Sequence, residues 1–74
     1  MRLKQAGIGG KVLKVGSWVG FKSGLEQRGE ITDISMNDWG REILTIWNPD
    51  GIEGGFGYHG NTTIFLPAED CWIL

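Results

Sequence analysis

The chain has 74 residues, of which 41% are hydrophobic and 22% charged, with a net charge of −2 and one cysteine. A chain of this length and composition folds around one small core rather than staying disordered. It has no apolar run approaching the roughly 20 residues of a transmembrane helix, no segment typical of a signal peptide, and no second cysteine for a disulfide. We therefore expect a single cytoplasmic domain with no membrane partner.

Residues 1–11 are rich in glycine, and we expect them to form a mobile basic arm in front of a folded domain at residues 12–74. No acidic residue precedes Glu26, whereas from there onward nine acids accompany only two arginines. A basic arm is a feature of nucleic-acid-binding proteins. The residues that would serve that role are Arg2, Lys4, Lys11 and Lys14. Because the whole chain is acidic, we favour a contact between the arm and the acidic body of the same or a neighbouring copy.

The pattern of apolar residues predicts short β-strands separated by turns, and no stretch shows helical periodicity. Along the first expected strand, Val15, Val19 and Phe21 share one face, which places Trp18 on the other face. A loop is expected to follow at residues 22–27.

The second expected strand, at residues 29–35, has an irregular pattern. Its two apolar residues, Ile31 and Ile34, are three positions apart and therefore have opposite parity. Either this strand contains a β-bulge, or one of the two isoleucines faces outward.

The third expected strand, at residues 42–47, is rich in β-branched and aromatic residues. Leu44 and Ile46 share one of its faces. The segment Asn-Pro-Asp-Gly at residues 48–51 then has proline and glycine at the positions that favour a tight turn. It predicts a hairpin in which the chain from Ile52 onward runs back beside the third strand.

The spacing G-x-G-x-x-G occurs at Gly55, Gly57 and Gly60. A dinucleotide-binding fingerprint requires a helix that opens on the last glycine, so that the helix N-terminus meets the pyrophosphate. Residues 62–66 predict a strand instead. The spacing is therefore a coincidence, and the glycines serve to bend the chain.

Catalytic and metal-binding motifs are lacking. His59 and Cys71 are the sole residues of their types, and they form a nucleophile and base only if the fold joins them. A zinc site needs more such ligands. We therefore predict no enzyme activity, no catalytic residue, no metal and no cofactor.

The aromatic residues are the unusual feature of a chain this short, because a narrow barrel cannot enclose so many large rings. Strand parity places Trp18 and Trp47 opposite their core neighbours. These rings either shield the outside and the ends of the fold, or form a shallow patch for a partner. The candidate binding residues are Trp18, Trp39, Trp47, Phe56, Tyr58 and Trp72.

The segment at residues 48–60 is longer than a simple turn requires. Its glycines leave the backbone thinly covered, while Phe56 and Tyr58 supply apolar area. One hypothesis makes this segment a contact with a partner or a second subunit, with Trp39 and Trp47 alongside. The other makes Phe56 a plug at one end of the barrel.

The segments Val-Gly-Ser-Trp-Val-Gly-Phe at residues 15–21, Gly-Glu-Ile-Thr-Asp-Ile at residues 29–34 and Pro-Ala-Glu-Asp-Cys-Trp-Ile at residues 67–73 resemble an SH3-like small barrel. The resemblance implies an all-β fold of five or six strands. One short helical turn at residues 67–70 would precede a closing strand at residues 71–74.

The chain lacks the aromatic-acidic motif and the tryptophan pair of polyproline-binding SH3 domains, so that activity is not implied. The Gly-x-Ile element at residues 29–31 is also similar to KOW and Tudor-type barrels, which implies nucleic acid or methylated side chains as ligands. Solitary barrels of this kind suit phages, mobile elements and housekeeping complexes alike. We expect a small binding module for another protein or for copies of itself, with nucleic-acid binding through the arm as the alternative.

Overall fold

The structure, a computed structural model, describes residues 3, 5–8, 11–57 and 61–74, and for Ile8 and Lys11 the backbone alone. Its strands are β1 (Gln5–Ile8), β2 (Lys11–Lys14), β3 (Trp18–Ser23), β4 (Leu25–Met36), β5 (Glu42–Trp47), β6 (Thr63–Pro67) and β7 (Cys71–Ile73). The 3-10 helix η1 (Ala68–Asp70) lies directly before β7. Over these residues the protein is all-β, and the predicted helical turn before the last strand is confirmed.

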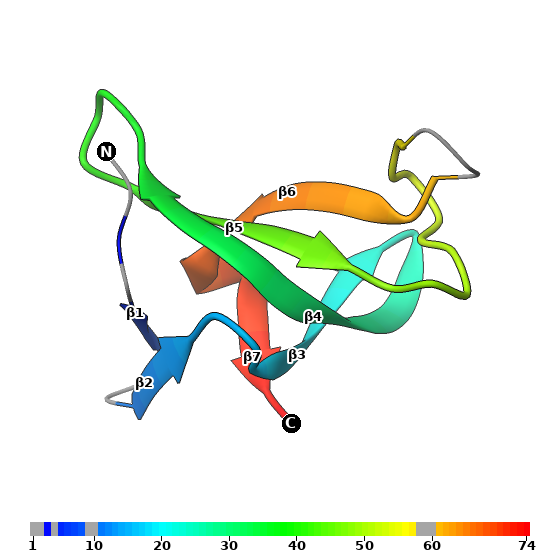
Figure 1. Cartoon of the computed structure of the whole chain (residues 1–74), viewed down its shortest axis with the longest axis horizontal. Helices are drawn as coiled ribbons and strands as arrows, with labels where there is room; N and C mark the ends of the chain where they lie inside the picture. Colours follow the sequence, from blue (N-terminus) through cyan, green and yellow to red (C-terminus); the bar gives the residue numbers. More distant parts are fainter. Residues whose placement is uncertain (1–2, 4, 9–10, 58–60) are drawn as a thin grey trace.

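Five strands form one antiparallel sheet in the order β6-β5-β4-β3-β7, while β1 and β2 form a separate hairpin (Figure 1). With 12 residues, β4 pairs with β3 along its first half and with β5 along its second. This staggered pairing, together with the natural twist of strands, wraps the inner face of the sheet around the core.

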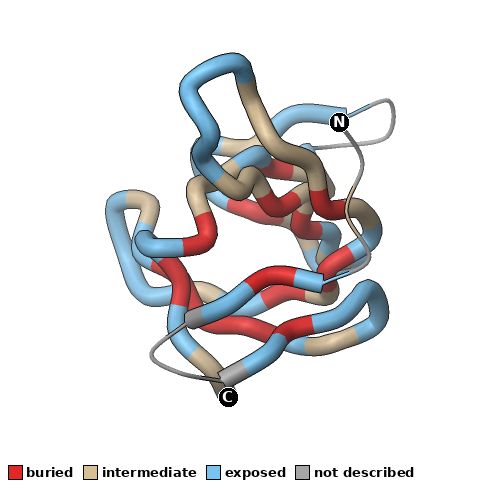
Figure 2. The backbone as a smooth tube through the Cα atoms, turned by 90° about the vertical axis from the view of Figure 1, so that its left-hand side faces the viewer, coloured by how far each residue is buried: buried red, intermediate tan, exposed pale blue. Residues whose placement is uncertain are grey.

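The core follows the alternation predicted from the sequence. Val19 and Phe21 of β3 are fully buried, as are Leu44 and Ile46 of β5. Figure 2 shows buried positions interspersed with exposed ones along the chain. Val15 departs from the pattern, because it lies in the turn before β3 and is exposed.

The hairpin between β3 and β4 is tighter than predicted. The expected loop at residues 22–27 is wrong, since Ser23 pairs directly with Leu25 across the single residue Gly24. Gly24 has a φ of +81°, a conformation that glycine adopts without steric cost. The chain therefore reverses in one residue, and β4 begins at Leu25.

A bulge in β4 explains the irregular spacing of its isoleucines. Ile31 pairs with Ile46, but the next pair joins Asp33 to Thr45, so that the register shifts by one residue between them. Ile31 and Ile34 are both fully buried as a result. The bulge alternative is confirmed, and an outward isoleucine is ruled out.

The turn at Asn48–Gly51 forms as predicted, but the strand that returns beside β5 is β6. The N–H of Gly51 donates to the Asn48 carbonyl at 3.0 Å. The chain then makes a longer excursion, and Ile52, only 2% exposed, is inserted into the core. The predicted return of Ile52 onward beside the third strand is wrong. Gly54 and Gly57 have positive φ values, which interrupt any regular strand there.

The side chain of Gln27 holds the excursion against β4. Its Nε2 donates to the Glu53 carbonyl at 3.1 Å, and its Oε1 accepts the N–H of Glu53 at 2.9 Å. This amide therefore pairs with the loop backbone as a neighbouring strand would. Residues 63–67 then form a strand and not a helix, as expected for a coincidental glycine spacing, while Gly60 itself lies outside the described residues.

The β1–β2 hairpin covers one side of the core, beside η1 and β7. Ala6 and Leu13 are buried there, and the N–H of Leu3 donates to the Ile34 carbonyl at 2.7 Å. The boundary expected between residues 11 and 12 thus falls inside β2. Residues 5–8 pack with the domain, while the mobility expected for residues 1–11 stays a prediction.

Candidate binding surface

The outward side of the sheet over β7, β3, the first half of β4 and the end of β5 forms one surface, which we call the outer face. Val19 and Phe21 point inward from β3, so the alternate residues of that strand point outward. Gly29 and Ile31 are likewise buried on β4. The outer face therefore carries Trp18, Gly20, Arg28, Glu30, Trp47 and Trp72, and beyond them the directly paired and exposed Lys22 and Glu26.

Strand register arranges the first six of these residues in two adjacent rows. In the first row Trp18 pairs with Glu30, and Glu30 pairs with Trp47. In the second row Gly20 pairs with Arg28 on one side and with Trp72 on the other. Directly paired residues of neighbouring strands have Cβ atoms about 5 Å apart. Three indole rings thus surround one acidic and one basic residue.

The indole ring of Trp72 lies over Gly20. A Cβ atom added to Gly20 would overlap the ring atoms Nε1, Cε2 and Cδ1 of Trp72. Gly20 is buried although it faces outward, because the ring covers it. The absence of a side chain at position 20 therefore determines how Trp72 lies on the sheet.

All three rings remain partly open to solvent. Trp18 is 43% exposed, Trp47 37% and Trp72 38%. A shallow depression of about 440 Å³ adjoins the first row, and its lining residues are Trp18, Arg28, Asn48, Pro49, Asp50 and Leu74. Asn48 holds the turn against β4 by donating from Nδ2 to the Arg28 carbonyl at 2.9 Å.

Phe56 lies farther along, beyond β6. It forms an isolated antiparallel bridge with Thr63, the residue that pairs with Trp47. Its ring packs on Phe65 with centroids 4.9 Å apart and a tilt of 59°. Phe56 is exposed, so the residue inserted into the core is Ile52 and not Phe56. Phe65 was missed as a candidate, although its alternation with Ile64 on β6 indicates an outward side chain.

Trp39 does not join the other rings. It lies in the turn between β4 and β5 and is 84% exposed. The N–H of Trp39 donates to Oδ1 of Asn37 at 3.0 Å, which defines that turn. Trp47 ends β5, so the length of this strand separates the two tryptophans. Tyr58, the remaining aromatic candidate, lies outside the described residues.

The residues considered for chemistry are not assembled into a reactive site. Cys71 is buried, and its Sγ donates to the Pro67 carbonyl at 3.6 Å. Burial, reinforced by the neighbouring Asp70 carboxylate, raises the pKa of the Cys71 thiol to about 11. His59 lies outside the described residues. Over the part of the chain that is described, no group of His, Cys, Asp and Glu could hold a metal.

Of the basic candidates for nucleic-acid contact, one can be placed. Lys14 is exposed at the end of β2. Arg2 and Lys4 lie outside the described residues, as does the side chain of Lys11. Among the described helical residues, none belong to a helix long and apolar enough to cross a membrane.

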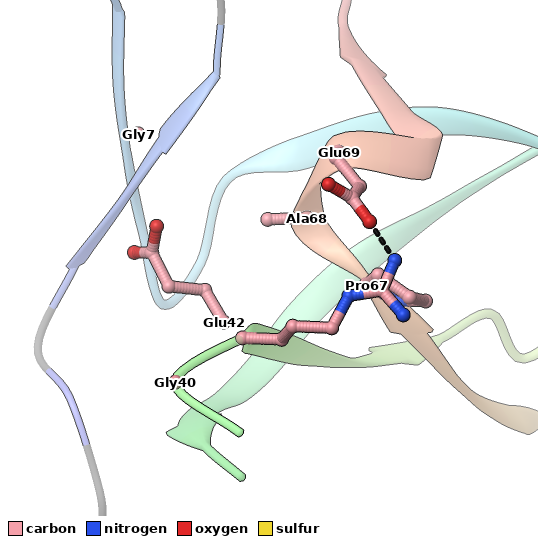
Figure 3. A pocket seen from close by; sticks show the side chains of 7 residues that line it. Gly7, Gly40, Glu42, Pro67, Ala68 and Glu69 are labelled. Carbon is pink, nitrogen blue, oxygen red and sulfur yellow. Dashed lines mark ion pairs between the residues drawn. The ribbon is translucent and has the colours of Figure 1, made fainter.

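A second hollow, of about 270 Å³, lies between β1, the β4–β5 turn and η1. Its lining residues are Gly7, Gly40, Arg41, Glu42, Pro67, Ala68 and Glu69. Figure 3 shows the ion pair between Arg41 and Glu69 at its rim. Arg41, the basic residue of this hollow, is already paired with Glu69. Glu42 is therefore the one charged lining residue of the hollow without an ion-pair partner among the described residues. The outer face is the stronger candidate.

Comparison of the chain with protein-family models, with curated proteins and with solved structures finds no match. The function is therefore argued from the outer face itself.

Proposed function

We propose that this protein is a non-catalytic binding module that acts through its outer face, by contact with another protein or with copies of itself. The observation that carries the proposal is the gathering of Trp18, Trp47 and Trp72 on one side of one sheet, each more than a third exposed. Tryptophan is one of the residue types enriched among the energetically dominant residues of protein interfaces. Covering these rings removes apolar surface from water, which favours association.

The architecture proposed for this module is the SH3-like barrel. The strand order β6-β5-β4-β3-β7 and the position of η1 directly before β7 support that resemblance. A non-catalytic role is supported by the protonated, buried state of the Cys71 thiol, because the thiolate is the nucleophilic form. A cytoplasmic location is part of the proposal and agrees with a free thiol.

The experiment compares tryptophans on and off the outer face. Tagged wild-type protein and its Trp18→Ala and Trp39→Ala variants are used to capture binding proteins from a lysate of the source cells, with quantification by mass spectrometry. We expect Trp18→Ala to reduce recovery of a captured protein by about tenfold or more, as for a residue at the centre of an interface. Trp39→Ala removes a more exposed ring from the β4–β5 turn and should leave recovery unchanged.

Circular dichroism checks that both variants keep the fold. Self-association is measured on the same proteins by sedimentation. If Trp18→Ala retains all captured proteins and the wild-type oligomeric state, the outer face is not the binding surface. The alternative, nucleic-acid binding through Arg2, Lys4, Lys11 and Lys14, then becomes the leading hypothesis.

A further inference from the structure

The two rows of the outer face that contain the tryptophans carry one basic and one acidic side chain, both on β4. Arg28 and Glu30 are separated by Gly29 on β4, and both point outward. In the described part of the chain neither of them takes part in an ion pair. Two unpaired charges of opposite sign therefore lie among three partly exposed indoles.

A two-fold rotation can exchange the two rows of the outer face, so that each row faces the other row on a second copy of the chain. We propose, on the basis of the proposed function, that the outer face binds the outer face of another copy of this chain. The two-fold axis would lie in the interface and cross the strands at the level of Val19 and Gly29. This level separates the row of Trp18 and Glu30 from the row of Gly20 and Arg28.

Rotation about this axis exchanges the two rows while each strand faces its own equivalent. Arg28 of one copy then faces Glu30 of the other, and the converse pair forms by symmetry. An isologous interface always repeats each contact in this way. Within these two rows the face is therefore complementary in charge to itself, whereas a partner of a different kind would need both charges placed in the reverse order.

The same rotation matches the apolar groups. Trp18 of one copy is placed above Gly20 of the other, where the ring of Trp72 covers the backbone. Two contacts between Trp18 and Trp72 result. Aromatic rings in such contacts prefer offset or tilted arrangements. At the margin, Trp47 is placed above Pro49, the residue two positions after it along the chain.

The available area predicts a weak dimer. A standard interface covers about 800 Å² on each partner, which is about one sixth of the total surface of 4883 Å². The exposed parts of the three indoles supply about 200 to 300 Å² of this, if each ring buries 150 to 250 Å² when fully covered. The dimer is therefore expected to form reversibly and to depend on concentration.

Charge reversal at the two positions tests the symmetry directly. Arg28→Glu presents two acidic groups in these two rows, and Glu30→Arg presents two basic groups. Each variant alone sets like charges opposite one another, which disfavours the dimer. Mixed together, the two variants are complementary at both contacts. Arg41→Glu makes the same charge change as Arg28→Glu but lies off the outer face, and it serves as the matched control.

The measurement is sedimentation velocity between about 10 µM and 1 mM at low ionic strength, where surface charges are least screened. We expect wild type and Arg41→Glu to dimerise, and each outer-face variant alone to need at least about tenfold higher concentration. The equimolar mixture should form a heterodimer, identified by native mass spectrometry after isotopic labelling of one variant. The double variant Arg28→Glu/Glu30→Arg should regain the homodimer, which keeps the test valid if one single variant folds poorly.

A wild-type protein that stays monomeric over this range overturns the inference, as does association of the single variants equal to that of wild type. If the wild type is monomeric but Trp18→Ala still loses a captured protein, the proposed binding function stands and only the self-pairing fails. If neither dimerisation nor capture depends on the outer face, both proposals fail.

Discussion

The contact between Gly20 and Trp72 predicts that Gly20→Ala changes stability in opposite directions in the wild-type protein and in a Trp72→Ala variant. In the wild-type protein a methyl group at position 20 overlaps the indole of Trp72, so Gly20→Ala forces the ring to move. In a Trp72→Ala background the ring is gone and the methyl group meets no such obstacle. The same substitution should therefore destabilise one protein and stabilise the other.

The magnitudes follow from two opposing effects at position 20. Overpacking costs about 1 to 3 kcal/mol, whereas replacing glycine by alanine within a strand gains about 0.5 to 1 kcal/mol. Gly20→Ala should lower the free energy of unfolding of wild type by about 1 to 2 kcal/mol. It should raise that of Trp72→Ala by about 0.5 to 1 kcal/mol, which gives a coupling energy of about 2 kcal/mol.

Gly29→Ala provides the matched control on the neighbouring strand. A methyl group there meets the side chain of Ile46 and lies 3.0 Å from the Trp47 carbonyl, and it should destabilise both backgrounds equally. Urea unfolding at low protein concentration, followed by far-ultraviolet circular dichroism, measures all six proteins. Equal destabilisation by Gly20→Ala in both backgrounds would show that Trp72 does not lie over Gly20.

Three further predictions concern other parts of the molecule. Gln27→Ala removes both hydrogen bonds to the backbone of Glu53, so stability should fall by about 1 to 2 kcal/mol, and amide exchange in residues 52–55 should accelerate more than in a Glu26→Ala control. The pKa of Cys71 is raised to about 11, so the folded protein holds a proton that the unfolded chain releases above pH 9. Stability should therefore fall between pH 9 and 11 by at most about 3 kcal/mol more in wild type than in Cys71→Ala, and an identical decline in both proteins would contradict this. Mobility-shift assays should show no nucleic-acid complex at about 0.15 M salt. A complex that forms at that salt and weakens steeply as more salt is added would show that the basic arm binds phosphates, and would refute the assignment of the arm to other contacts.

Several elements of the fold could be predicted because they depend on residues close together in sequence. The alternation of Leu44 and Ile46 with their neighbours marks the inner face of β5, and Pro67 marks the turn into η1. The spacing of Ile31 and Ile34 limited β4 to a bulge or an outward isoleucine. In the structure both isoleucines are buried in the same core, and the register shift in β4 makes this possible. The tertiary structure therefore selects the bulge.

Other features could not be predicted because they depend on distant segments. The turn at residues 48–51 was recognised correctly, but its local chemistry does not specify that β6, rather than the chain from Ile52, pairs with β5. That choice follows from the insertion of Ile52 into the core and from the pairing of Gln27 with Glu53. The tight reversal at Gly24 was missed because a single glycine permits such a turn without requiring it.

For the candidate surface, too, some features follow from the sequence and others only from the tertiary structure. Sequence alternation alone determines that Trp18 and Trp47 point away from the core, since successive side chains of a strand point to opposite faces. Only the tertiary structure places them in one row with Glu30 between them, brings Trp72 over Gly20, and leaves Trp39 at the far end of β5. The direction of a side chain is a local property of the backbone. Its neighbours depend on which strands pair and in which register, and burial of the whole core selects that register.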